Sequence, residues 1–187
     1  MNITNIDDIR KLASGDEGGR TEYKLITGQL ERGMETLCAF LNGEGGTVLF
    51  GVADNGKITG QEVSDKTKRE IAEAIRLFEP FATITVSYAN IPDTDKQVIA
   101  LYAEEQRYMR PFTYKGRAYQ RIESVTSVMP QDKYNHLLMQ RGGKYSWEAI
   151  PNPDLQISDL DENVIIGAVR AGINCGRLPE TTIREEI

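Results

Sequence analysis

The sequence predicts an α+β domain in which a mixed sheet with two β-hairpins is flanked by helices, followed by a short helical C-terminal extension. Apolar residues recur at both helical and strand spacing within the first 143 residues. Two turn signals, Asp54-Asn55-Gly56-Lys57 and Gly116-Arg117, each separate two strand-like segments. Beyond Gly142-Gly143 an extended stretch leads to further helical segments. We therefore predict a domain over 1–143 and a helical linker over 144–187.

The first part of the domain alternates between helix and strand. Ile6–Leu12 is predicted to form a short helix, because Asn5 or Asp7 can cap it and glycines follow it. Thr21–Ile26 alternates like a strand. Apolar residues then recur at helical spacing from Leu30 to Leu41, before Asn42-Gly43 ends the helix.

The continuous apolar run Thr47–Val52 is predicted to form a buried central strand. After the Asp54–Lys57 turn, the short strand Lys57–Gly60 is expected to double back as the first hairpin. A helix begins after Ser64 or Asp65 and closes before Pro80. Two further strands follow, at Thr83–Tyr88 and Val98–Ala103.

The second hairpin is predicted to join Phe112–Lys115 to Ala118–Ile122 through Gly116-Arg117. A helix follows from Pro130 to Arg141. Further on we expect an extended linker over Trp147–Pro153, a helix from Ser158-Asp159 to Arg170, and another that starts at Pro179. The last of these has barely begun at Ile187, so the chain is expected to be part of a longer protein.

The net charge of −6 excludes a protein whose whole surface grips nucleic acid, because phosphate contacts need a positive surface. Between Lys96 and Arg121, however, six basic and two acidic residues give a local charge of +4, against −10 for the rest. Aromatic side chains on which bases can stack are interleaved with these cations. The alternative is that half of the aromatics are core and that the arginines pair with Glu104 and Glu105. The predicted nucleic-acid-binding residues are Lys24, Arg107, Arg110, Lys115, Arg117 and Arg121.

Three carboxylates can converge near one end of the predicted sheet. Glu17 and Glu22 surround the start of the first strand, and Asp54 follows the buried strand Thr47–Val52. Converging carboxylates hold divalent cations such as Mg²⁺ or Mn²⁺, which can activate water against a phosphodiester. The alternative is a solvated rim with a helix cap or a surface ion pair, because surface carboxylates are abundant in acidic chains.

No apolar run has the length of a signal-peptide core or of a bilayer span. We therefore expect a cytoplasmic protein with no membrane partner.

Three segments together resemble the Schlafen AlbA-2 family over about Ser14–Arg141. The first is Glu22-Tyr23-Lys24, and the second runs from Cys38 to Gly56 and includes Ala39-Phe40-Leu41-Asn42 and Gly51-Val52-Ala53-Asp54. The third, Gly116–Thr126, resembles the family's Tyr-x-Arg-x-Gly-Ser-x-Thr stretch, although Glu123 stands where the family has a small residue.

The resemblance implies a bacterial DNA-binding transcriptional regulator of which this chain is the N-terminal module. An ATP-binding domain commonly follows in such proteins, so ATP binding is expected only there, and a homodimer is compatible with the sequence. Some animal members are RNA endonucleases that use two glutamates, an aspartate and a divalent metal, and Glu17, Glu22 and Asp54 match those positions. The resemblance thus leaves three alternatives: a binding module, an endoribonuclease loaded with Mg²⁺ or Mn²⁺, and a non-catalytic scaffold.

Overall fold

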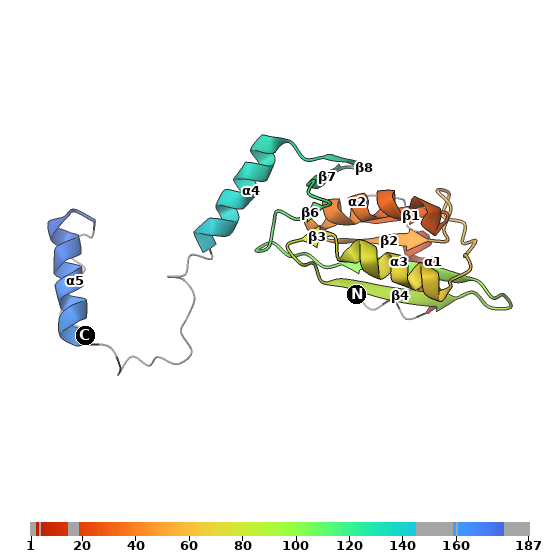
Figure 1. Cartoon of the computed structure of the whole chain (residues 1–187), viewed down its shortest axis with the longest axis horizontal. Helices are drawn as coiled ribbons and strands as arrows, with labels where there is room; N and C mark the ends of the chain where they lie inside the picture. Colours follow the sequence, from red (N-terminus) through yellow and green to blue (C-terminus); the bar gives the residue numbers. More distant parts are fainter. Residues whose placement is uncertain (1–2, 4, 15–18, 145–158, 160, 178–187) are drawn as a thin grey trace. The chain divides into compact units, whose positions relative to one another are not determined.

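The structure is a computed structural model, and it describes residues 3, 5–14, 19–144, 159 and 161–177 (Figure 1). The chain forms two compact units, residues 1–144 and 145–187. Helices and a mixed sheet occur together in the first unit, which confirms the predicted α+β class. In the described part of the chain, no helix has the length and apolar character needed to cross a bilayer.

A four-stranded mixed sheet forms the centre of the first unit, with strand order β1-β2-β5-β4. β1 (Thr21–Lys24) pairs in parallel with β2 (Gly46–Phe50). β5 (Gln97–Ala103) is antiparallel to both β2 and β4 (Ile84–Asn90). Every residue of β2 is buried, as expected for a strand that is covered on both faces.

Helices cover both faces of this sheet. α2 (Leu30–Leu41) and α3 (Asp65–Ile75) contribute to one core, which also contains Val48 and Phe50 of β2. α1 (Ile6–Ala13) buries Ile9 in a second core with Leu49 on the opposite side of the strand. Because side chains alternate along a strand, β2 supplies both cores at once.

The predicted starts of two helices are confirmed by their caps. The Asn5 side chain accepts hydrogen bonds from the amides of Asp7 and Asp8, which forms a capping box at α1. Ser64 and Thr67 cap α3 in the same reciprocal way. A single turn of 3₁₀ helix, η1 (Thr27–Gln29), leads directly into α2.

The first predicted hairpin is shorter than expected. The turn that contains Asp54 is present, but Lys57–Gly60 forms only an isolated bridge between Ile58 and Val52. The amides of Thr59 and Gly60 both donate to the carbonyl of Gly51, so the returning chain crosses close to that glycine instead of running alongside β2. A Cβ on Gly60 would meet the Ile91 side chain at 2.4 Å, which explains the need for glycine there.

The predicted second hairpin is shorter than expected, because only its turn is closed, by a bridge in which the amides of Tyr114 and Arg117 donate to each other's carbonyls at 2.8 and 3.0 Å. The tight turn falls on Lys115 and Gly116, whose φ angles are 51° and 75°. The two segments then diverge: β6 (Thr113–Tyr114) pairs with β3 (Phe78–Glu79), and β7 (Tyr119–Ile122) pairs with β8 (Val125–Val128). Figure 1 shows β7 and β8 near α2, apart from the main sheet.

Asn42 explains why these two segments separate. Its side chain lies between them at the end of α2, accepts a hydrogen bond from the Phe112 amide at 2.7 Å, and donates to the carbonyls of Phe112 and Tyr119 at 2.9 and 3.0 Å. The backbone groups that would pair across a hairpin are therefore bonded to one buried amide.

Two helices differ from their predicted bounds. α4 (Gln131–Lys144) continues through Gly142-Gly143, because glycine lowers helix propensity without removing the backbone hydrogen bonds. α5 (Glu162–Asn174), in the second unit, begins after Asp161, whose side chain accepts from the amides of Asn163 and Val164. The predicted linker over 147–153 and the helix from Pro179 lie outside the described residues.

Glu123 offers a test of backbone strain in the turn between β7 and β8. It adopts a φ of 53°, which costs a residue with a Cβ about 1 kcal/mol. We expect Glu123→Gly to raise the free energy of unfolding by up to about 1 kcal/mol in urea denaturation. Glu123→Ala keeps the Cβ and should gain nothing. An equal gain in both variants would show that the carboxylate, and not the backbone, is responsible.

Candidate nucleic-acid interface

Lys24 and Arg121, two of the predicted phosphate-binding residues, are held by Glu22. Both oxygens of this buried carboxylate are engaged: Oε1 accepts from Lys24 Nζ, and Oε2 lies 2.8 Å from Arg121 Nη2. The Arg121 side chain is only 6% exposed, and its guanidinium lies 5.1 Å from the centroid of the Phe40 ring. These two cations thus belong to the interior of the unit.

Arg121 also connects β7 to neighbouring elements. Its Nη1 donates to the hydroxyl of Thr126 in β8 at 3.1 Å, and that hydroxyl lies 3.1 Å from the hydroxyl of Thr36 in α2. One guanidinium therefore joins β1, β7, β8 and α2. These hydrogen bonds fix the plane of the guanidinium group. Charge attraction alone, which has little directional preference, would not fix it.

Arg107 and Arg110 share the carboxylate of Glu105. Arg107 Nε donates to Glu105 Oε1 at 2.6 Å and Arg110 Nη2 donates at 3.1 Å. The hydrogen bond from Arg107 is the main reason that the pKa of the Glu105 carboxyl falls below its usual value. Burial is the main reason that the pKa of Arg110 is lowered, and Arg110 also donates to the carbonyl of Gly43. The predicted alternative, pairing with neighbouring acids, thus describes these two arginines.

Lys115 and Arg117 lie on either side of Gly116 but differ in their partners. Lys115 Nζ lies 2.6 Å from Glu31 Oε2 in α2. Burial is the main cause of the raised pKa of the neighbouring Tyr114, whose hydroxyl donates to the same carboxylate. Arg117 is exposed, and no ion pair involves it in the described part of the chain. Five of the six predicted cations therefore have carboxylate partners, and Arg117 is the exception.

The start of α4 lies against β7, and we call this region the β7–α4 junction. The amide of Met129 donates to the carbonyl of Ala118 at 2.8 Å, and Lys133 Nζ donates to Gln120 Oε1 at 2.8 Å. Lys133 is exposed, and the described residues give it no carboxylate partner. The junction therefore presents Arg117 and Lys133 as cations that are not neutralised by an ion pair.

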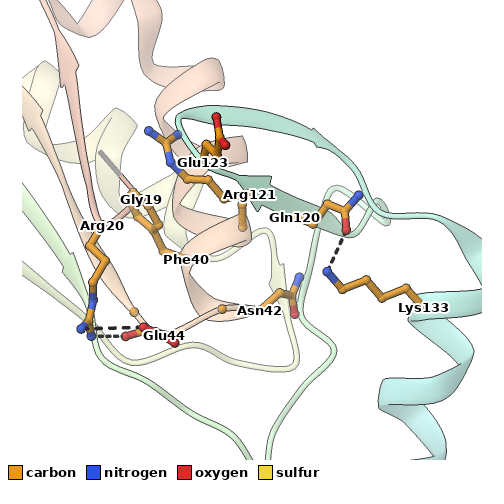
Figure 2. Close-up of a pocket in the computed structure, with 12 residues that line it drawn as sticks. Gly19, Arg20, Phe40, Asn42, Glu44, Gln120, Arg121, Glu123 and Lys133 are labelled. Atoms are coloured by element: carbon orange, nitrogen blue, oxygen red, sulfur yellow. Dashed lines mark hydrogen bonds and ion pairs between the residues drawn. The ribbon is translucent and has the colours of Figure 1, made fainter. Parts of the chain in front are cut away.

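One pocket at the junction, which we call the Gly19 pocket, is shown in Figure 2. Its volume is about 300 Å³. Lys133 and Gln120 lie on one side of it, and Arg20 lies on the other, where Arg20 binds both the carbonyl and the carboxylate of Glu44. The lining residues are Gly19, Arg20, Ala39, Phe40, Asn42, Gly43, Glu44, Gly45, Gln120, Arg121, Glu123 and Lys133.

A second pocket, the Arg117 pocket, has a volume of about 340 Å³. It combines an exposed cation with an aromatic side chain, because both Arg117 and Tyr134 line it. It shares no residue with the Gly19 pocket, but neighbouring residues line different pockets. Ala118, which precedes β7, lines the Arg117 pocket, and Gln120 of β7 lines the Gly19 pocket. Tyr134 and Lys133 of α4 divide in the same way. The β7–α4 junction is therefore hollowed on both sides.

The sequence did not single out Lys133, Gln120 or Arg20. One signal could have indicated Lys133, which is the third residue of α4. A cation in the first turn of a helix lies beside the positive end of the helix dipole, which is unfavourable. A lysine at this position therefore indicates an interaction outside the helix. Arg20 and Gln120 carry no such signal, because the pocket that joins them forms only when β1, β7 and α4 come together.

Of the three carboxylates predicted to hold a divalent metal ion, the structure describes Glu22 and Asp54. Both oxygens of Glu22 bind cationic side chains, Asp54 is exposed in the turn after β2, and Glu17 lies outside the described residues. A metal ion at Glu22 would have to compete with Lys24 and Arg121. Within the described ranges, no group of three or more His, Cys, Asp or Glu side chains is arranged to hold a metal ion.

Comparisons with known proteins agree with the sequence pattern. The family model described as "Schlafen, AlbA_2" matches residues 17–130. No curated protein matches the chain. Among solved structures, the chain is similar to the crystal structure of the DIP2311 protein from Corynebacterium diphtheriae, with 13% sequence identity and a TM-score of 0.48. That likeness covers 94% of this chain, which spans 40% of the length of the other.

Proposed function

We propose, from the premise that this chain belongs to the Schlafen AlbA_2 family of nucleic-acid-related domains, that its first unit binds nucleic acid through the β7–α4 junction. The observation that carries the proposal is the pair Arg117 and Lys133, which lie beside two pockets and have no carboxylate partners among the described residues. The phosphates of a nucleic acid bind lysine and arginine side chains of this kind, and binding releases counterions from the nucleic acid. Since the whole chain carries a net charge of −6, the negative remainder helps to restrict a polyanion to this site.

The finer form of the proposal is a DNA-binding module that regulates transcription as part of a longer protein. Phosphate contacts position a protein on either nucleic acid but do not distinguish DNA from RNA. Affinities for DNA and RNA strands of the same sequence therefore test this finer form. Tighter binding to DNA supports a role in transcription, and tighter binding to RNA overturns it.

We propose binding without cleavage. Lys24 and Arg121 neutralise Glu22, so this carboxylate is poorly placed to collect a divalent cation. Labelled RNA that is incubated with the protein and Mn²⁺ is expected to stay intact, as judged on a denaturing gel. Asp54 is exposed, so Asp54→Asn should fold normally. Cleavage by the wild type that disappears in this variant would contradict the proposal and favour the endoribonuclease.

Removing the two junction cations should weaken binding and its dependence on salt. We expect Arg117→Ala with Lys133→Ala to lower the affinity for a labelled strand by about tenfold or more at low salt. Each lost phosphate contact should reduce the slope of log K against log salt by about 1. Fluorescence anisotropy at about 50 mM and about 200 mM salt measures both quantities.

The matched control removes two positive charges elsewhere on the same unit. Arg107→Ala with Lys115→Ala deletes cations that are paired with Glu105 and Glu31. This control should keep most of the wild-type affinity and salt slope. An equal loss in both double variants would show that net charge, and not the junction, determines binding.

A further inference from the structure

We infer that the Gly19 pocket receives one unpaired nucleotide of the bound strand. This inference rests on the proposed function and deepens it, because it specifies single-stranded nucleic acid, or a nucleotide that leaves a duplex, as the ligand. The pocket has the necessary size. Its volume of about 300 Å³ lies at the lower end of the range for small-molecule sites, which fits a single nucleotide and is far too small for a base-paired helix.

The walls of the Gly19 pocket allow a flat group to approach the backbone. Gly19 lines the pocket and contributes no side chain. Among the described residues, the nearest atom that a Cβ on Gly19 would meet is the carbonyl oxygen of Glu123 at 3.9 Å, so these residues leave room for a side chain at this position. An unsubstituted backbone of this kind is suited to a planar base that makes close contact.

Polar groups that suit the base and the phosphate of a nucleotide line the Gly19 pocket. Gln120 is 8% exposed, and its side-chain amide is the type of group that recognises the edge of an unpaired base. Lys133 uses one N–H on Gln120 and can donate others to a phosphate. Arg20 provides a second cation across the pocket, where its hydrogen bond to the Glu44 carbonyl orients it (Figure 2).

Arg121 forms a rigid part of the pocket wall, although its side chain is only 6% exposed. Its guanidinium is bonded to Glu22 and Thr126 and lies against the Phe40 ring, and both Arg121 and Phe40 line the pocket. A planar group that is already fixed loses little conformational freedom when a base binds beside it.

Glu123 opposes a phosphate at the same pocket. It lines the pocket together with Glu44, and a carboxylate repels the negative charge of a nucleotide. Glu123→Gln should therefore increase affinity, by about threefold, while Lys133→Ala decreases it. Opposite effects from these two variants distinguish a charged ligand in the pocket from a general loss of folding.

The test uses a variant that fills the pocket. Gly19 does not have a positive φ, so Gly19→Leu should fold and place its side chain in the open space. The probes are a labelled single strand of about 12 nucleotides, the corresponding blunt duplex, adenosine 5′-monophosphate and inorganic phosphate. Gly167→Leu is the control, because a Cβ on Gly167 meets nothing within 4 Å. Thermal melting of both variants confirms that they are folded.

The inference predicts that the wild type prefers the single strand to the duplex, and that the monophosphate competes where inorganic phosphate does not. It also predicts that Gly19→Leu lowers strand affinity by about tenfold, whereas Gly167→Leu leaves it unchanged. Strand binding that depends on Arg117 and Lys133 but is unaffected by Gly19→Leu overturns the inference and leaves the proposed function intact. Monophosphate binding without strand binding overturns the proposed function and, with it, the inference that the bound nucleotide belongs to a strand, and a wild type that binds no probe also overturns both.

Discussion

Replacing Arg121 by alanine is expected to lower the free energy of unfolding by about 3–5 kcal/mol. The substitution leaves the Glu22 carboxylate buried with only Lys24 as a cationic partner, and it removes the hydrogen bond to Thr126 and the contact with Phe40. Urea denaturation followed by circular dichroism measures the change. Arg107→Ala is the matched control, since it deletes an exposed arginine with a carboxylate partner and should change the stability far less than Arg121→Ala does.

The companion substitution Glu22→Gln shows whether the loss comes from the pair. If Glu22 and Arg121 act together, the double variant should lose clearly less than the sum of the two single losses. Additive losses, or a loss below about 1 kcal/mol for Arg121→Ala, would contradict the description of a buried ion pair.

Replacing Asn42 by alanine should lower the free energy of unfolding by about 3 kcal/mol or more. Its side chain satisfies the amide and the carbonyl of Phe112 and the carbonyl of Tyr119, at a position where the residue is 8% exposed. A buried backbone group that loses its partner costs about 1–3 kcal/mol. The control Asn135→Ala removes an exposed amide that bonds only to Gln131, and should change stability by less than about 0.5 kcal/mol.

Asn42→Asp separates the two parts of this role. Aspartate keeps an acceptor for the Phe112 amide but brings a negative charge to the carbonyls of Phe112 and Tyr119. It should therefore destabilise the protein at least as much as alanine does at neutral pH. A tolerated Asn42→Asp would mean that this amide does not donate to the two carbonyls.

The sequence predicted those elements that depend on short-range interactions. Asn5 and Ser64 mark helix starts because a cap bonds to amides two or three residues away. The helix Leu30–Leu41 and the buried strand before Gly51 follow from the spacing of neighbouring apolar residues. The sequence patterns therefore located the helices, the central strand and the turn at Asp54 within a few residues.

Pairing between distant segments was not predictable in the same way. The turn at Lys115-Gly116 was predicted correctly, but Asn42, far away in sequence, bonds to the backbone of Phe112 before the turn and of Tyr119 after it. The sequence of Phe112–Ile122 does not by itself indicate the hydrogen bonds that Asn42 makes to this segment. The missed β3–β6 pair has the same origin, since its two strands have two residues each and the Phe78 and Tyr114 rings pack together 5.1 Å apart.

Charge in the sequence does not reveal which cations are available to a ligand. The stretch from Lys96 to Arg121 is basic, yet most of its cations bind Glu105, Glu31 or Glu22. Glu31 and Glu22 lie in other elements, so their effect appears only in the folded protein. The sequence indicated Glu22 as a metal ligand and Arg121 as a nucleic-acid contact, but not the bond between them.

A map of the amides that respond when a single strand is added tests the central claim most directly. In ¹H–¹⁵N NMR spectra of the protein, we predict that the largest shift changes cluster at Arg117–Arg121, Gln131–Tyr134 and Gly19-Arg20 as the strand is titrated. Changes that are largest around Glu105 and Arg107, or in the turn between β4 and β5, would contradict binding at the β7–α4 junction.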